Sequence, residues 1–186
     1  MLRIGLNGLI WAVTLSYPFL VWYSLDYFQP RSIALALAAV FLLRLLAQHS
    51  SRKPAGITAI LAPACLIFLL AIALANETRW LLSYPVLVSL SFFAIFAYSL
   101  LYPPSAIERL ARLEDPDLPA KGVAYTRKVT WVWSVFFFCN AGISLATLWY
   151  GDPWLWSFYN GCLFYILMGL LMAGEMLIRR KVKASY

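Results

Sequence analysis

The chain has 186 residues, of which 63% are hydrophobic and only 12% are charged, with a formal net charge of +7. Soluble domains contain roughly 45–50% apolar and about 25% charged residues, so this composition excludes a water-soluble globule. The 17% aromatic content excludes a disordered chain, and three Cys are too few for a disulfide scaffold. With a mean hydropathy of +0.76, the sequence is typical of a polytopic membrane protein.

Six apolar runs follow one another along the chain. A helix needs about 20 apolar residues to cross a hydrocarbon core of about 30 Å, and most of the runs are this long. The runs are continuous rather than alternating, and a helix pairs every backbone N–H and C=O within its own segment. The sequence therefore predicts an all-α fold of six transmembrane helices, over residues 4–25, 32–47, 56–75, 80–101, 129–150 and 154–178.

The second run is the shortest. Its 16 residues, 32–47, would span only about 24 Å as a helix. Pro30 can occupy the first helical turn, and Arg31 and Arg44 can extend their charged ends to opposite interfaces. We expect this segment to cross the membrane; the alternative is a re-entrant hairpin.

Positive charges divide sharply between the two sides that six spans create. Of the fifteen Lys and Arg residues, only Arg31 and Arg79 fall on one side. Because Lys and Arg are enriched in cytoplasmic loops, this asymmetry predicts that both termini are cytoplasmic. The short external connections then make residues 1–186 a single transmembrane domain of three helical hairpins.

The longest polar stretch, residues 102–128, is expected to be a cytoplasmic loop. Within it, Ser105 and Glu108 have the spacing of a capping box, which predicts a short amphipathic helix over 105–114. The expected apolar side of this helix comprises Ile107, Leu110 and Leu113. Basic side chains of the loop are candidates for contacts with the anionic inner leaflet or a partner: Arg109, Arg112 and Lys121.

Ionisable and amide side chains inside the predicted spans are candidate functional positions. Glu175 lies about one turn from the end of the last span and precedes Arg179 by four residues. It is either a proton-coupling carboxylate or, as we expect, one partner of an interfacial ion pair that holds the last two helices together. The remaining candidates, expected to join helices by hydrogen bonds or to flank the spans, are Asn140, Asn160, Arg127, Lys128 and Asn7.

Few residues could carry chemistry. The chain has eight acidic residues, one His and three Cys without a C-x-x-C pattern, and Glu114, Asp115 and Asp117 read as a solvated turn rather than a metal site. We therefore expect no catalytic residues, no cofactor, no metal and no nucleic-acid partner.

Four stretches of the last third carry a resemblance to known proteins: Tyr125–Trp133, Phe136–Asn140, Trp156–Gly161 and Leu170–Arg180. They resemble a family of small, uncharacterised bacterial inner-membrane proteins commonly encoded in aryl polyene (xanthomonadin-like) gene clusters. The last two spans are also distantly similar to the intracellular septation protein A family. The resemblance covers roughly residues 118–180. It implies a multi-pass protein of the bacterial cytoplasmic membrane that serves envelope or polyene-lipid assembly, and it supplies no catalytic residue.

Three functions are compatible with these features. The expected one is a non-enzymatic accessory or scaffold protein that docks soluble acyl-chain biosynthetic enzymes at the membrane. A transporter or flippase of a polyene lipid, acting as a homodimer, is the alternative, because the intramembrane polar residues could line part of a path. An integral-membrane transferase is the third, although such enzymes usually show clustered His or Asp residues.

Overall fold

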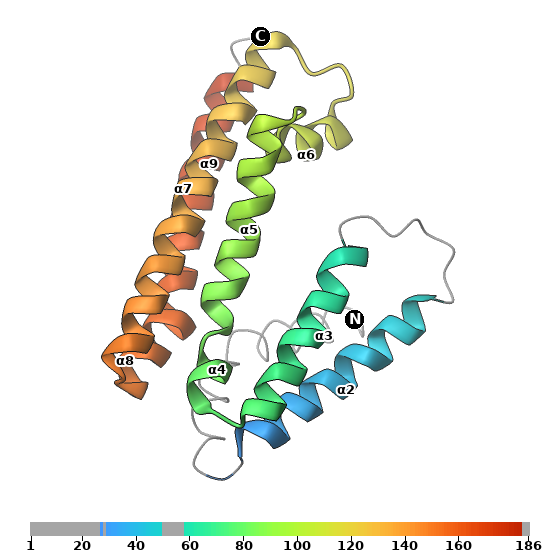
Figure 1. Ribbon diagram of the computed structural model, residues 1–186. Coiled ribbons are helices and arrows are strands. Elements are labelled where there is room, and N and C mark those ends of the chain that lie inside the picture. Colours follow the sequence, from blue (N-terminus) through green and yellow to red (C-terminus); the bar gives the residue numbers. More distant parts are fainter. Residues whose placement is uncertain (1–26, 28, 50–57, 184–186) are drawn as a thin grey trace, which may run out of the picture. The chain divides into compact units, whose positions relative to one another are not determined.

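The computed structural model describes residue 27, residues 29–49 and residues 58–183 (Figure 1). The first predicted span, 4–25, and Asn7 within it lie outside the described residues. The described residues fall into two compact units, divided between Ser83 and Tyr84.

The first unit contains three helices: α2 (Pro30–His49), α3 (Thr58–Ala75) and α4 (Thr78–Leu82). The second unit contains six consecutive helical segments: α5 (Tyr84–Leu101), α6 (Ala106–Glu114), α7 (Ala120–Tyr150), α8 (Pro153–Phe158), the π-helical segment η1 (Tyr159–Leu163) and α9 (Phe164–Lys183). The predicted all-helical class is confirmed for the described residues.

Within the described residues, three helical stretches are long and apolar enough to cross a membrane: Thr78–Leu101, Ala120–Tyr150 and Pro153–Lys183. They correspond to the predicted spans 80–101, 129–150 and 154–178. Helix α2 is longer than its predicted sixteen residues because Pro30 begins it and His49 ends it. Its 20 residues correspond to about 30 Å of helix.

A cation joins α2 and α3 of the first unit. Arg31 donates from Nε to the carbonyl oxygen of Ala73 (2.9 Å), and its backbone N–H donates to Oδ1 of Asn76 (3.0 Å). The last carbonyls of α3 have no partner within their own helix, and they carry partial negative charge that a cation stabilises. Arg31 therefore closes the α2–α3 hairpin (Figure 1).

The predicted span 80–101 is interrupted. A turn at Ser83 separates α4 from α5, because Pro85 has no N–H to donate to the carbonyl of Leu81 and so cannot continue the helix. The backbone N–H of Ser83 bonds instead to the carbonyl of Trp80 (3.3 Å), and its hydroxyl donates to the same oxygen (2.7 Å).

In the second unit, α5 packs along α7 (Figure 1). Phe137 is the buried centre of this contact, with 6% of its surface exposed. Its ring stacks on Phe92 at 4.9 Å and meets Phe96 edge-on at 5.5 Å between ring centroids. Such offset and edge-to-face pairs stabilise packing beyond the area that they bury.

Helix α7 differs from its predicted bounds, 129–150. It begins nine residues earlier, with Pro119 as N-cap and Ala120 as its first helical residue. The charges of Lys121, Arg127 and Lys128 stop a hydropathy run but do not stop a helix, since Lys and Arg have high helix propensity. The loop 102–128 is accordingly shorter than expected, and the 31 residues of α7 extend about 46 Å, more than a bilayer core.

The α2–α3 hairpin generates a prediction at Asn76, which has a left-handed backbone (φ 51°). Replacing it with Ala removes the hydrogen bond to Arg31 and puts a residue in the left-handed region that adopts it less readily than Asn does. Asn76→Gly also removes the hydrogen bond, but Gly adopts this conformation without a steric penalty. We expect Asn76→Ala to lower the free energy of local opening by about 1 kcal/mol more than Asn76→Gly does. Hydrogen exchange at the end of α3 measures this difference, and an equal loss in both variants would contradict it.

Candidate functional site

A polar seam runs along the buried face of α7. Its members recur every three to six residues, at intervals that place them on one helix face: Thr126, Thr130, Ser134, Asn140, Ser144 and Thr147. The hydroxyls of Thr126, Thr130, Ser134 and Thr147 donate to carbonyls three or four residues earlier in α7, at 2.8–2.9 Å. These four side chains are therefore small and satisfied within α7, which permits close helix approach in a membrane.

Asn140 joins three helical segments. Its Nδ2 donates to the hydroxyl oxygen of Ser89 on α5 (2.7 Å), and its Oδ1 accepts from the hydroxyl of Tyr159 in η1 (2.9 Å). Ser89 in turn donates to the carbonyl of Pro85 (2.7 Å). All three hydrogen-bonded side chains are buried, with 3–6% of their surfaces exposed. Asn140 therefore links α5, α7 and η1 through side-chain hydrogen bonds.

Asn160 forms the second link, again with α7. Its Oδ1 accepts from the hydroxyl of Ser144 (2.7 Å), and its Nδ2 donates to Oγ1 of Thr147 (3.4 Å) and to the carbonyl of Trp156 (2.9 Å). Asn160 lies in η1, where a wider helical turn replaces the α-helical one. Both Tyr159 and Asn160 are buried and reach α7 from this segment, so the two amide clusters occupy successive turns of the same interface.

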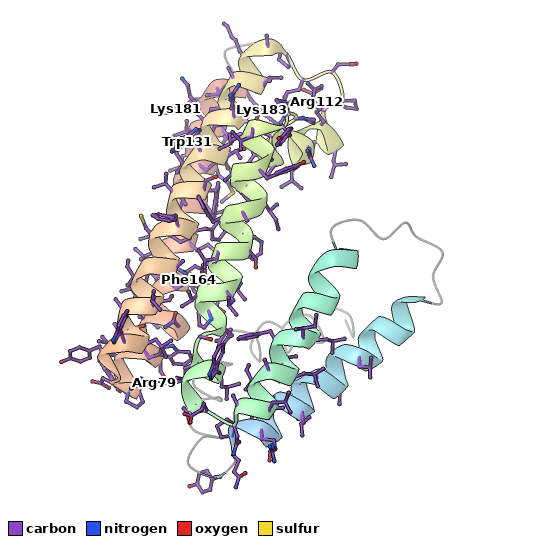
Figure 2. The ribbon with its side chains drawn as sticks, in the orientation of Figure 1. Arg79, Arg112, Trp131, Phe164, Lys181 and Lys183 are labelled. Atoms are coloured by element: carbon purple, nitrogen blue, oxygen red, sulfur yellow. The ribbon has the colours of Figure 1, made fainter. Side chains whose placement is uncertain are left out.

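All cationic side chains described in the second unit gather at one end. Helix α7 begins and α9 ends at this end of the unit. The cationic residues there are Arg109, Arg112, Lys121, Arg127, Lys128, Arg179, Arg180, Lys181 and Lys183. Figure 2 shows Arg112, Lys181 and Lys183 at this end of the unit, near which Trp131 also lies. Five acidic residues accompany them, namely Glu108, Glu114, Asp115, Asp117 and Glu175. We call this region the basic end; its formal charge is positive.

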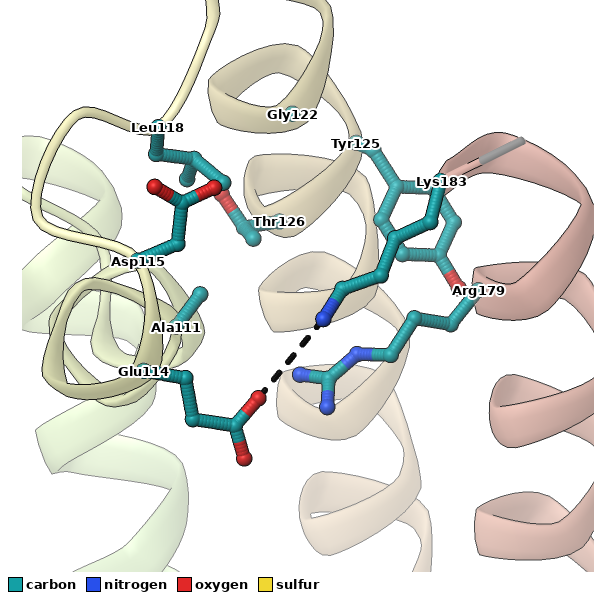
Figure 3. A pocket seen from close by; sticks show the side chains of 9 residues that line it. All are labelled: Ala111, Glu114, Asp115, Leu118, Gly122, Tyr125, Thr126, Arg179 and Lys183. Carbon is teal, nitrogen blue, oxygen red and sulfur yellow. Dashed lines mark ion pairs between the residues drawn. The ribbon is translucent and has the colours of Figure 1, made fainter. Parts of the chain in front are cut away.

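A small pocket lies at the basic end between α6, α7 and α9 (Figure 3). Glu114 and Lys183 face one another across it, with 3.7 Å between Oε2 and Nζ. Both side chains are at least half exposed, so this ion pair contributes little to stability. The volume of about 20 Å³ suits a water molecule rather than an organic substrate.

Glu175 forms its ion pair within α9. Its Oε1 lies 3.3 Å from Nε of Arg179 on the same helix. The link to α7 comes from Tyr125, whose hydroxyl lies 3.3 Å from Oε1 and 3.2 Å from the carbonyl oxygen of Glu175. Glu175 therefore holds the last two long helices together through a phenol. Arg127 and Lys128, which were expected to flank the predicted span 129–150, are exposed on α7. They make no ion pair with any described acid.

Helix α6 is fixed at its N-terminus. The capping box is confirmed: the Ser105 hydroxyl accepts from the N–H of Glu108, and the Glu108 carboxylate accepts from the N–H of Ser105, both at 3.4 Å. Two further helical N–H groups bond to neighbouring helices, Ala106 to Oγ of Ser99 (2.9 Å) and Ile107 to Oγ1 of Thr130 (3.3 Å). Orphan N–H groups of a helix start are thus satisfied by α5 and α7.

The three basic residues predicted to contact the membrane or a partner have different surroundings. Arg112 pairs with Glu108 (2.9 Å) and donates to the carbonyl of Pro116 (3.0 Å), so its guanidinium is held within the protein. Arg109 is exposed and donates from Nε to the carbonyl of Pro104 (2.9 Å). Lys121 is exposed in the first turn of α7.

Sequence reasoning missed five residues that complete these clusters: Ser89, Tyr125, Ser144, Thr147 and Tyr159. A hydroxyl in a membrane helix is common and can bond to its own backbone, so nothing in the residue type marks it as an interhelical partner. Only the alignment of neighbouring helices could have identified them. Ser89 and Tyr159, for example, become hydrogen-bond partners of Asn140 once α5 and η1 are aligned with α7. Among the described residues, no three His, Cys, Asp or Glu side chains gather as metal ligands would.

No protein-family model matches the chain, and neither a characterised protein nor a solved structure shows significant similarity to it. The resemblance to the aryl polyene-cluster proteins stays a prediction.

Ser89 and Ser91 provide a matched test of the Asn140 cluster. Ser91 is exposed on α5 and bonds only to the carbonyl of Leu87 in the described structure. Ser89→Ala leaves the Asn140 amide without its acceptor and should lower the free energy of unfolding by about 1 kcal/mol. Ser91→Ala should change it by less than about 0.5 kcal/mol. Thermal unfolding in detergent micelles measures both; equal losses would contradict an interhelical role for Asn140.

Proposed function

We propose that this chain is a non-enzymatic accessory or scaffold protein of the bacterial cytoplasmic membrane, which serves the assembly of envelope or aryl polyene lipids. It crosses the membrane six times with both termini in the cytoplasm, so that the basic end faces the cytosol. Soluble acyl-chain biosynthetic enzymes dock there through acidic surfaces.

The observation that carries the proposal is the exposed positive charge of the basic end. Arg127, Lys128, Arg180 and Lys181 are exposed, and none of them forms an ion pair with another described residue. Cations that are not used internally remain free to attract an acidic partner. Such long-range complementarity mainly raises association rates and selects the partner, and it weakens with salt.

The polar groups within the spans support a structural role for the core. The amides of Asn140 and Asn160 and the carboxylate of Glu175 all bond to groups of the same chain. A path for a polar substrate needs groups that can exchange partners with it, whereas these are engaged. This arrangement favours a scaffold over a transporter.

A transporter or flippase of a polyene lipid is the second candidate function. It is favoured by Ser157, whose hydroxyl is buried, with 2% of the residue exposed, and has no hydrogen-bond partner among the residues that the structure describes. Ser157 immediately precedes the last residue of α8, next to η1, and π-helical segments are frequent at functional sites.

The test is a deletion strain complemented with two variants at equal membrane abundance. Arg180→Gln with Lys181→Gln neutralises two exposed cations, while the remaining cations keep the charge asymmetry. Asn140→Leu with Glu175→Gln alters the polar core. A scaffold predicts that the first variant lowers the polyene lipid in both membranes and the second does not, as measured by mass analysis of inner- and outer-membrane extracts.

Two other outcomes would contradict the scaffold. Loss caused by the core variant, with lipid accumulating in the inner membrane, would indicate transport. A lipid that lacks one covalent group in the deletion strain would indicate a transferase.

A further inference from the structure

Helix α6 has its acidic side turned inward and its leucines turned outward. Glu108 is buried, with 7% of its surface exposed, whereas Leu110 and Leu113 are 57% and 81% exposed. The predicted apolar side is therefore divided, because Ile107 lies partly buried toward the helices while the other two face away from them. A short helix that served only to cover the protein would bury its leucines.

The orientation of α6 is fixed by polar contacts rather than by apolar packing. Glu108 is held by the Ser105 N–H and by Arg112, and the first helical N–H groups bond to Ser99 and Thr130. The contacts of Glu108 lie within α6 and its N-cap, so the bonds to Ser99 on α5 and Thr130 on α7 are the ones that set the rotation of the helix. Turning α6 to bury the leucines would break these two bonds and leave the N–H groups of Ala106 and Ile107 unpaired, which is costly. The exposed leucine face is thus built into the fold.

The depth of α6 follows from its neighbours. Exposed Trp131 and Trp149 on α7 are separated by 18 residues, about 27 Å of helix, which matches the distance between the aromatic belts of a bilayer. Thr130, to which α6 bonds, is adjacent to Trp131. At the same end of α5, Tyr98, Leu101 and Tyr102 are 59–76% exposed just before α6. These contacts place the start of α6 at the level of the headgroups.

Charge on this face favours an anionic leaflet. Arg109 is exposed beside the leucines, and within the described part of the chain its guanidinium bonds through Nε alone, to the carbonyl of Pro104. Glu114, one turn after Leu110, faces Lys183, so its carboxylate charge is offset. A helix with exposed leucines next to a cation is typical of segments that lie in the membrane interface.

We propose that Leu110 and Leu113 of α6 insert at the boundary between headgroups and acyl chains of an anionic leaflet, where Arg109 binds lipid phosphate. The occupant of this face is lipid. This inference rests on the membrane insertion that the proposed function assumes, but not on a soluble partner. It divides the basic end into a lipid-bound α6 and the exposed cations of α7 and α9.

Site-specific fluorescence tests this inference. In a full-length Cys65→Ala, Cys139→Ala, Cys162→Ala background, a polarity-sensitive dye is attached at Leu113→Cys or Asp117→Cys. The second position is the matched control, because Asp117 is exposed in the turn that follows α6. The protein is reconstituted in vesicles of phosphatidylcholine and phosphatidylglycerol that contain an acyl-chain nitroxide lipid as quencher.

Insertion predicts that the dye at Leu113→Cys emits at shorter wavelength than at Asp117→Cys and is quenched at least about threefold more strongly. A third label at Ile143→Cys, on the exposed surface of α7 between Trp131 and Trp149, reports the span itself. If Ile143→Cys is quenched and Leu113→Cys is aqueous, the α6 inference is wrong and the membrane span stands. If both are aqueous, the membrane assignment fails as well.

A charge reversal tests the role of Arg109. Arg109→Glu should reduce quenching at Leu113→Cys at least about twofold in the anionic vesicles, because the new carboxylate repels lipid phosphate. Lys121→Glu is the matched control, since Lys121 lies in the first turn of α7 and not on α6. Equal quenching in Arg109→Glu and Lys121→Glu would overturn the assignment of Arg109 to lipid phosphate.

Discussion

The constraint on which the second unit depends is that hydrocarbon offers no hydrogen bonds to a polar side chain. Asn140 and Asn160 can be buried only because Ser89, Tyr159, Ser144 and Thr147 supply matching donors and acceptors. These pairs act in fixed register, since a shift of α7 by one residue would turn the amides away from them. The amides therefore determine how α5, α7 and η1 align, while the phenylalanine contacts around Phe137 add area without specifying register.

The helical class, three apolar stretches, the capping box of α6 and the Glu175–Arg179 pair could be predicted from sequence, because each depends on spacing within one segment. The π-helical turn at Tyr159–Leu163 could not, since nothing in the residue types there demands a wider turn. The early start of α7 was missed because a hydropathy run ends at a charge, whereas a helix does not.

The candidate site was less predictable than the fold, because its residues meet through tertiary packing. The sequence indicates that Glu175 helps to hold the last two helices together. Its partner on α7 is the phenol of Tyr125 and not Arg127 or Lys128. Likewise, helical periodicity places Ile107, Leu110 and Leu113 on one side of α6. Two hydrogen bonds to α5 and α7 orient the helix so that only the two leucines face outward. The spacing of apolar residues predicts that a helix has an apolar face, whereas contacts with neighbouring helices determine the direction in which that face lies.

The two uses proposed for the basic end are compatible because they draw on different side chains. A lipid phosphate neutralises a cation that it contacts, so Arg109 could not also attract an acidic protein. Arg180 and Lys181 follow Ile178, the last residue of the apolar run of α9, by two and three positions, which is about 3–5 Å of further helix. Their long side chains can extend away from the bilayer from that level. Anchoring α6 in the leaflet would hold these cations at a fixed height, where a soluble enzyme could meet both the protein and the membrane surface on which its product is used.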